Sequence, residues 1–241
     1  MTIAEQGLRL QARLAGALYL LIIVLAGFAE GYVRSSLVVP GQAASTASNI
    51  LASPVLFRLG VAADLTAFLA DAAVAVLLYG LLRATSPTIA LLALVFRLVA
   101  HPAIAAINLL NPVAALLVLE GPGPLSGLPL SEREGLAQLA MDLHGYGYLI
   151  AGAFFGIHCV LLGYLLWRSP RFPQFLGILM GLAAAGYLLE TGSVLLASSL
   201  ATLARQMVVI TAVAGEGGLC LYLLICGVRS AESLADAPTE S

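Results

Sequence analysis

Three histidines lie inside long apolar stretches of this chain, where an imidazole could act as an acid–base group or as a ligand. His144 and His158 are 14 residues apart, which is close to four helical turns. Both therefore project from one helix face, about 21 Å apart along the helix axis. His101 belongs to a different apolar stretch. Hydrocarbon tolerates such side chains only where they face protein, cofactor or water, so the histidines predict a polar interior site.

Asp71 and Arg97 lie near the middle of two consecutive apolar stretches that a short turn connects. A charge at the bilayer centre costs at least about 2.5–3.5 kcal/mol, so we expect the two side chains to meet. Their pairing could be structural, or Arg97 could contact an anion or a substrate. Further candidates for a ligand or ion site in the apolar stretches are Asp64, His101, Asp142, His144, Tyr146, Tyr148, Glu190 and Glu216.

The histidines also allow two cofactor hypotheses. Two-haem cytochrome b bundles place histidines on one helix at a similar spacing, but three histidines complete at most one bis-histidine haem. The candidate ligands of a single b-type haem are His101, His144 and His158. A zinc site is disfavoured because the three histidines are expected at three depths in the membrane. The cofactor is thus left unknown, and the absence of lysine excludes a retinal Schiff base.

Glycines are frequent in the stretch that carries two of the histidines. They occur at Gly145, Gly147, Gly152, Gly156 and Gly163. Small residues let helices approach closely within a membrane, which is one interpretation of this pattern. The other interpretation is that the glycines leave room for a flat ligand.

The composition indicates a membrane protein with little soluble mass. Of the 241 residues, 61% are hydrophobic and only 10% are charged, whereas soluble domains carry about 25% charged residues. The net charge of −2 provides no basic surface for nucleic acid. The three cysteines lie in apolar runs without a Cys-x-x-Cys pair, so we expect free thiols rather than a disulfide.

Six apolar runs are long enough to cross about 30 Å of hydrocarbon. They predict an all-α, polytopic membrane protein with six transmembrane helices in one bundle. The predicted spans are residues 13–33, 56–82, 87–119, 132–167, 174–200 and 204–228. Residues 1–12 are expected to form a cytoplasmic segment, residues 13–228 the transmembrane domain, and residues 229–241 a disordered tail.

Three local features refine this plan. Ser45–Ala52 could form a short interfacial helix between the first two spans. Pro102 and Pro112 predict kinks in the long third span. Ser131 and Glu134 have the spacing of a capping box, which would start the fourth span.

The arginines between the spans indicate an orientation. One side of the membrane would collect Arg9, Arg13, Arg83, Arg168, Arg171 and Arg229. The other side would collect Arg34, Arg58, Arg133 and Arg205. Positive loop residues stay in the cytoplasm, so both termini are predicted to be cytoplasmic.

Several motifs from Arg13 to Glu190 occur together in one order. They are RLAGALYL from Arg13, FAE from Phe28, FRL at both Phe57 and Phe96, HGYGYLI from His144, and FGIHCVLLGYLLWRS from Phe155. These motifs resemble a prokaryotic integral membrane family named domain of unknown function 4386. The resemblance implies a single membrane domain in a prokaryotic inner membrane, and it implies no activity.

The predicted function is to bind or move a small molecule or ion at a buried polar site, with the lipid bilayer as surroundings. We expect this site at the outer end of the fourth span, where His144, Tyr146 and Tyr148 would face Arg97, His101 and Asp71. His158 is expected to stand apart as a packing residue. The alternatives are a membrane-embedded enzyme or redox protein and a structural membrane subunit.

Overall fold

The computed structural model describes residues 3–121, 123–196 and 198–229, and the described residues form helices and connections without a strand. Six helices among them are long and apolar enough to cross a membrane, which confirms the all-α, six-span prediction. Most of the predicted tail, residues 230–241, lies outside the described residues.

The six spans follow one another along the chain. Span one comprises α1 (Ile3–Ala26), the π-helical η1 (Gly27–Arg34) and α2 (Ser35–Leu37), and span two is α4 (Pro54–Leu82). Span three comprises α5 (Pro87–Leu98), the π-helical η2 (Val99–Ala105), α6 (Ala106–Asn108) and α7 (Leu110–Glu120). Span four is α8 (Leu130–Arg168) and span five is α9 (Gln174–Leu196). Span six comprises α10 (Ala201–Ala212), the π-helical η5 (Val213–Gly217) and α11 (Gly218–Ile225).

Helix boundaries follow local chemistry at several ends. Pro54 and Pro87 occupy first-turn positions, where the missing N–H leaves no bond unmade. Gly121 ends α7 with a φ of 64°, a left-handed conformation that glycine adopts without strain. The capping-box prediction was wrong, because α8 begins at Leu130 after Pro129 and Ser131 lies inside its first turn.

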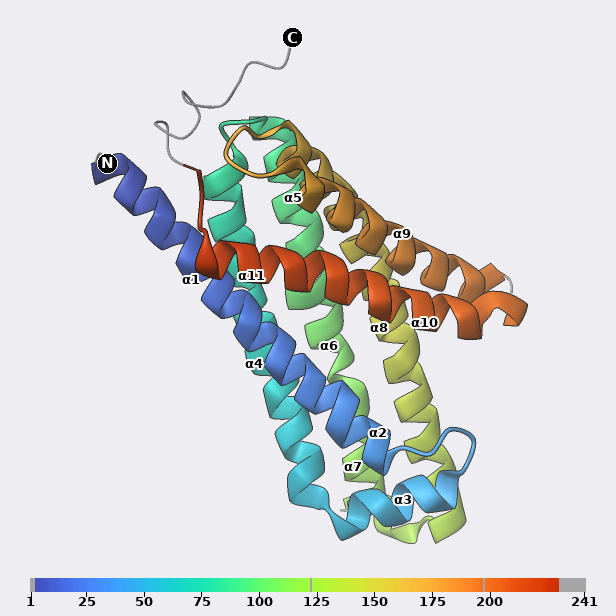
Figure 1. The fold of residues 1–241 in the computed structure, drawn as a ribbon. Helices are drawn as coiled ribbons and strands as arrows, with labels where there is room; N and C mark the ends of the chain where they lie inside the picture. Colours follow the sequence, from blue (N-terminus) through green and yellow to red (C-terminus); the bar gives the residue numbers. More distant parts are fainter. Residues whose placement is uncertain (1–2, 122, 197, 230–241) are drawn as a thin grey trace.

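The connection between spans one and two contains the expected short helix, α3 (Ala43–Ala52). It crosses the end of the bundle opposite to the start of α1 and the end of α11 (Figure 1). Thr46 fixes it to the preceding turn, because its hydroxyl bonds both the N–H and the carbonyl of Val39 at 3.0 and 3.2 Å. Two short 3-10 helices, η3 (Gly123–Gly127) and η4 (Ser198–Leu200), complete the connections at other places.

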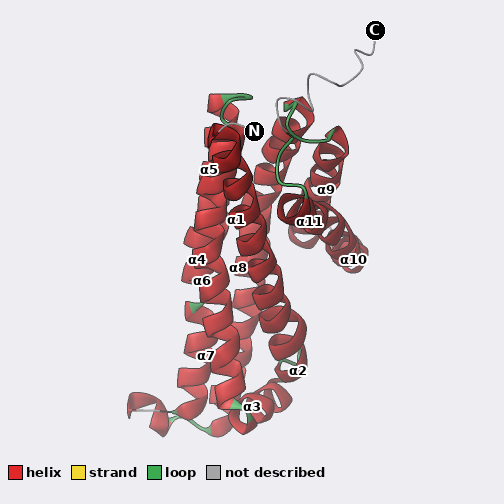
Figure 2. Cartoon of the chain, turned by 60° about the vertical axis from the view of Figure 1, so that its left-hand side comes forward, coloured by secondary structure: helices red, strands yellow, loops and turns green. Residues whose placement is uncertain are grey.

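The spans form a closed ring in chain order. Along the chain, α1 packs on α4, α4 on α5, α5 on α8, α8 on α9, and α9 on α10. The ring closes where α11 packs against α1. Figure 2 shows α9, α10 and α11 gathered on one side of the longer helices. Because each span has two neighbours, every span turns one face toward a common interior.

The apolar core surrounds this interior. Its largest cluster joins side chains of all six spans, including Tyr19, Leu78, Phe155, Met180 and Leu219. A second cluster lies under α3, where it joins spans one, two, three and four. The cysteines are free as predicted, with Cys159 and Cys220 buried and Cys226 exposed.

Three of the spans contain a π-helical segment: η1 in span one, η2 in span three and η5 in span six. The predicted distortion at Pro102 is found within η2, since proline cannot donate the bond of a regular helix. Such segments insert a residue into the turn and are frequent at functional sites. Each of the three carries at least one ionisable side chain: Glu30 and Arg34, His101, and Glu216.

Close packing explains some of the glycines in α8. A Cβ on Gly163 would lie 2.9 Å from the Gly177 carbonyl oxygen of α9, and one on Gly156 would meet the side chain of Leu188 at 2.9 Å. One on Gly147 would clash with the side chain of Asn108. Gly145 has open space beside it.

The substitution Gly163→Ala should therefore lower the free energy of unfolding by about 1–3 kcal/mol, because backbone atoms of two helices cannot yield to the new methyl group. Unfolding in mixed detergent micelles measures the change. Gly181→Ala is the matched control, since its Cβ has no atom within 4 Å and alanine favours a helix. Equal stability of the two variants would contradict the proposed contact.

Candidate functional site

Arg97 of span three is the largest fully buried side chain among the described residues, and its guanidinium lies at the centre of the ring. Its Nε and Nη2 donate to Asp71 Oδ1 of span two at 3.1 and 2.6 Å. Its Nη1 contacts the Tyr19 hydroxyl at 3.2 Å and His158 Nε2 at 3.1 Å. The rings of Tyr19 and Phe155 lie against the guanidinium, with centroids 4.7 and 5.2 Å from Cζ. The predicted pairing of Asp71 with Arg97 is thus present.

His158 orients the other side of the guanidinium. Its Nδ1 lies 2.8 Å from the Ala93 carbonyl oxygen, which can only accept, so Nδ1 carries the proton. Its Nε2 then offers a lone pair to Arg97, which can only donate. Both ring nitrogens are therefore occupied, and the imidazole is neutral in this arrangement.

His101 contacts the second oxygen of the central carboxylate. Its Nδ1 lies 3.2 Å from Asp71 Oδ2. Asp71 is buried, whereas 21% of the His101 side chain is exposed. His101 is thus a partly exposed contact of the buried Asp71 carboxylate.

Glu216 of η5 adds a second carboxyl group. It accepts from the Tyr19 hydroxyl at 3.2 Å and from the Tyr187 hydroxyl at 2.6 Å. Tyr19 thereby connects the carboxyl of Glu216 to the guanidinium of Arg97. One hydrogen-bonded chain runs from His101 on span three to Tyr187 on span five.

We call this set of side chains the central network, and all six spans contribute to it. Its members are Tyr19 of span one, Asp71 of span two, Arg97 and His101 of span three, His158 of span four, Tyr187 of span five and Glu216 of span six.

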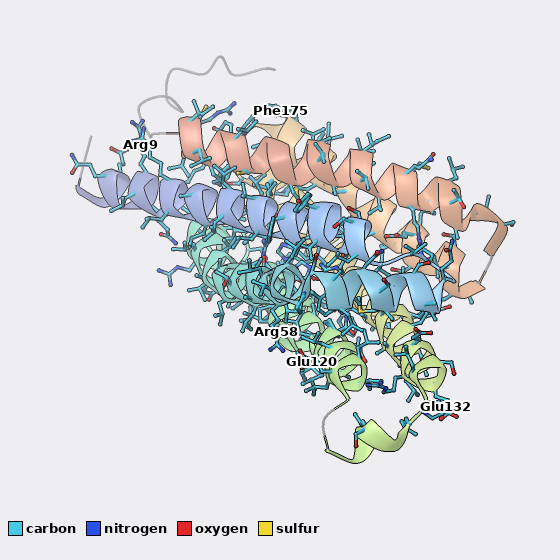
Figure 3. The ribbon with its side chains drawn as sticks, turned by 90° about the horizontal axis from the view of Figure 1, so that it is seen from below. Arg9, Arg58, Glu120, Glu132 and Phe175 are labelled. Carbon is cyan, nitrogen blue, oxygen red and sulfur yellow. The ribbon has the colours of Figure 1, made fainter. Side chains whose placement is uncertain are left out.

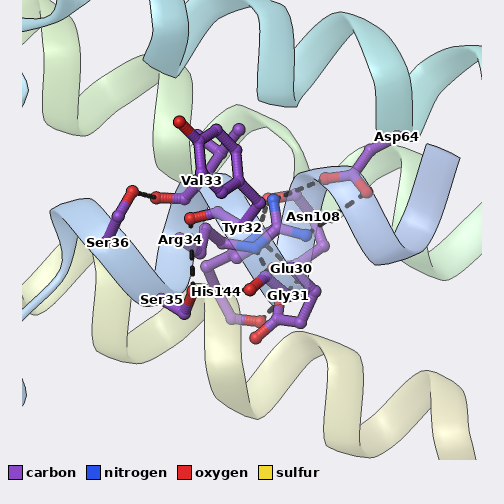
Figure 4. A network of polar contacts seen from close by, with 10 residues as sticks. All are labelled: Glu30, Gly31, Tyr32, Val33, Arg34, Ser35, Ser36, Asp64, Asn108 and His144. Atoms are coloured by element: carbon purple, nitrogen blue, oxygen red, sulfur yellow. Dashed lines mark hydrogen bonds and ion pairs between the residues drawn. The ribbon is translucent and has the colours of Figure 1, made fainter.

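A second cluster lies nearer the end of the bundle covered by α3. Arg34 is only 8% exposed, although its position suggested a loop. It pairs with Glu30 at 2.5 Å and with the buried Asp64 at 2.6 Å (Figure 4). Its guanidinium also lies 5.5 Å from the ring centroid of Tyr148.

His144 belongs to this second cluster. Its ring stands edge-on to that of Tyr148, at a centroid distance of 4.9 Å. Its Nδ1 lies 3.3 Å from the carbonyl oxygen of Asn108, which has no regular helical donor because Pro112 lacks an N–H. Asn108 Nδ2 in turn donates to the His144 carbonyl oxygen at 2.8 Å (Figure 4). Asn108 Nδ2 also lies 3.1 Å from His144 Nδ1, and the Nε2 atom of His144 is buried without a hydrogen-bond partner among the described residues.

Comparison with known proteins places these features in a family. The chain matches the family described as a domain of unknown function (DUF4386) over residues 14–227. It belongs to the DUF4386 family. An uncharacterized protein of Archaeoglobus fulgidus is 33% identical to it over 122 residues. That match covers 50% of this chain and 57% of the archaeal protein. No solved structure matches the chain.

Two expectations about α8 in this DUF4386 protein were wrong. His144 does not face Arg97, and His158 is a partner of Arg97 rather than an isolated packing residue. The reason lies in the antiparallel arrangement of spans three and four. Arg97 follows Pro87 by 10 residues, and His158 precedes Arg168 by 10 residues, so they lie at equal depth from the arginine-rich end.

Three side chains that were predicted as site residues lie outside both the central network and the second cluster. Tyr146 is 53% exposed, and Asp142 is exposed and accepts from Gln138 at 2.9 Å. Glu190 is partly buried, and its nearest arginine contact is Arg205 at 3.9 Å.

Sequence reasoning missed several members as well. Tyr19, Tyr187 and Arg34 were absent from the predicted site, although Tyr19 lies in one of the motifs noted above. Arg34 could have been found, because a glutamate four residues earlier indicates that the helix continues to it.

The histidines of this DUF4386 protein do not fit a bis-histidine haem. Both nitrogens of His158 are engaged, and the ring of Phe155 packs against His101 and His158 at 4.5 and 5.3 Å. His144 lies about 21 Å along α8 from His158, by the rise of the helix. Among the described residues, no three His, Cys, Asp or Glu side chains are grouped to hold a metal ion.

The central ion pair generates a stability prediction. Asp71→Asn should cost about 3–5 kcal/mol of unfolding free energy, because it leaves the Arg97 charge buried without its counter-charge. The double variant Asp71→Leu with Arg97→Met should recover most of that loss, since apolar groups need no partner. Unfolding in mixed micelles measures both.

The control is an exposed pair. Arg58 and Glu120 approach to 2.6 Å with side chains 59% and 36% exposed, and they lie at the periphery (Figure 3). Glu120→Gln should change the free energy of unfolding by no more than about 1 kcal/mol. An equal loss of unfolding free energy in Glu120→Gln and Asp71→Asn would contradict the prediction that burial makes the central ion pair more important for stability.

Proposed function

We propose that this DUF4386 protein binds or moves a small molecule or ion within the membrane, with the central network as its site. The observation that carries the proposal is the buried ion pair of Arg97 and Asp71, on which side chains of all six spans converge. Apolar side chains would hold a six-helix ring together at lower desolvation cost, so the presence of these buried charges supports a functional role.

The distorted backbone supports the same proposal. His101 lies in η2 and Glu216 in η5, so two of the titratable members occupy π-helical segments. A π turn leaves carbonyl groups without regular partners and rotates the side chains that follow it. Such segments can return to a regular helix when a ligand is bound or released, which would move His101 against Asp71.

The size of the interior favours an ion over a larger molecule. A cavity of about 10 Å³ lies beside His158, among alanine, leucine and tyrosine side chains of spans two, three and four. This volume has room for about one water molecule. A larger molecule would require the helices to separate, whereas a proton needs only the hydrogen-bonded side chains of the central network.

A specific observation favours a second candidate, a structural membrane subunit. Four of the five N–H groups of Arg97 already have partners, so the network could serve only to fix the order of the helices. A membrane-embedded enzyme or redox protein remains the third candidate, and the engagement of both His158 nitrogens weighs against its haem form.

We also propose a prokaryotic inner membrane with both termini in the cytoplasm. The start of α1, the end of α11 and the connections from α4 to α5 and from α8 to α9 lie at one end of the bundle (Figure 1). Because Arg34 is buried in an ion pair, it is not counted among the loop arginines that indicate orientation. Six arginines then stand against three, which supports the N-in orientation.

Ion flux into proteoliposomes tests the proposed function. Purified protein is reconstituted, and the movement of H⁺, Na⁺, K⁺ and Cl⁻ is followed under an imposed gradient and compared with protein-free liposomes. We expect flux of one of these ions, with at least a tenfold reduction in Glu216→Gln, because the amide cannot carry a proton or a charge for the two tyrosines.

Glu190→Gln is the matched control, because Glu190 lies in the neighbouring span but outside the central network. It should retain the wild-type flux, and both variants should be shown to fold by thermal unfolding. If the wild-type protein moves none of the four ions faster than empty liposomes do, the proposal of ion movement fails and the structural candidate takes its place.

A further inference from the structure

A polar groove opens at the arginine-rich end of the bundle, away from the central network. Its volume is about 360 Å³. It is formed by the turn between α8 and α9 together with the residue that ends the described chain. Its lining residues are Trp167, Arg168, Ser169, Pro170, Phe172, Pro173, Gln174 and Arg229.

Hydrogen bonds and packing hold the two sides of the groove together. The N–H of Arg229 donates to the Arg171 carbonyl oxygen at 3.1 Å, which fixes the end of span six beside the turn. Phe172 is 1% exposed and packs against the Tyr222 ring at a centroid distance of 6.0 Å. The groove is thus part of the folded bundle rather than the gap beside a loose loop.

The lining of the groove favours an anion. Arg168 and Arg229 are both exposed, and the lining contains no acidic residue. Gln174 is the first residue of α9, so N–H groups at the start of a 23-residue helix face the same region. Guanidinium groups bind phosphate oxygens through paired N–H donors, which makes a phosphate group a suitable ligand.

The position of the groove along the membrane normal favours a lipid as the source of that phosphate. The groove lies where span four ends, span five begins and span six ends, which is the level of the membrane headgroups. Trp167 is 44% exposed and belongs to the residue type that marks this interface. Phe175 is 54% exposed and points outward from the helices, where acyl chains would lie (Figure 3).

We propose that this groove binds the phosphate headgroup of an anionic phospholipid. Arg168 and Arg229 hold the phosphate, and Trp167 and Phe175 contact the glycerol and acyl regions. Basic pockets between the ends of spans recognise acidic headgroups in this way. The inference is independent of the central network and of any ion that it binds.

Native mass spectrometry of the full chain tests the assignment. Detergent-solubilised protein is mixed with phosphatidylglycerol or with phosphatidylcholine at equal concentrations. We expect phosphatidylglycerol to bind at least tenfold more strongly, and Arg168→Gln with Arg229→Gln to abolish this preference. Thermal unfolding checks that the double variant remains folded.

The matched control removes the same charge from the same end of the bundle. Arg13 and Arg83 are exposed there and do not line the groove, so Arg13→Gln with Arg83→Gln should keep the preference. An equal loss in both double variants would indicate a general charge effect and overturn the proposal. It is also overturned if the wild-type protein binds the two lipids equally.

Two further experiments test for other ligands of the groove. Displacement of phosphatidylglycerol by millimolar inorganic phosphate would make a free anion the ligand and refute the lipid assignment. The sequence after Arg229 contains Glu232, Asp236 and Glu240, so a chain ending at Arg229 is compared with the full chain. If only the shortened chain binds phosphatidylglycerol, the acidic segment occupies the groove and the proposal is wrong.

Discussion

The arrangement of this bundle depends on one buried electrostatic interaction, the ion pair of Arg97 with Asp71. Neither charge can be placed in hydrocarbon alone, because the desolvation cost of a single ion exceeds any packing gain there. The guanidinium also requires partners for its remaining N–H groups, and Tyr19 and His158 provide them. The packing of spans one, two and four around span three therefore provides Arg97 with its acceptors.

Span two takes part in polar interactions at two heights along the bundle axis. Asp64 and Asp71 are seven residues apart on one face of α4, about 10 Å along the axis. Each receives an arginine from a neighbouring span, Arg34 from span one and Arg97 from span three. The π-helical segments carry Arg34, His101 and Glu216, so the irregular backbone occurs where polar side chains meet the interior.

The second cluster differs from the central network because one of its buried polar atoms has no hydrogen-bond partner among the described residues. The central arginine is almost saturated by protein groups, whereas His144 keeps a buried nitrogen without a partner. Glu30 of the same cluster is 69% exposed, so this cluster extends to the outer surface of the bundle. His101, Tyr187 and Glu216 are the partly exposed members of the central network.

The sequence by itself determined the helices and their approximate ends, because span length and hydropathy are local properties of the chain. It also indicated the pairing of Asp71 with Arg97, since two opposite charges near the middle of adjacent spans have few other partners. Tertiary structure decided that His158 rather than His144 joins this pair, and that Tyr19, Tyr187 and Glu216 complete the network. The order of helices around the ring and the π turns set which faces meet, and both result from packing between spans that are far apart in the sequence.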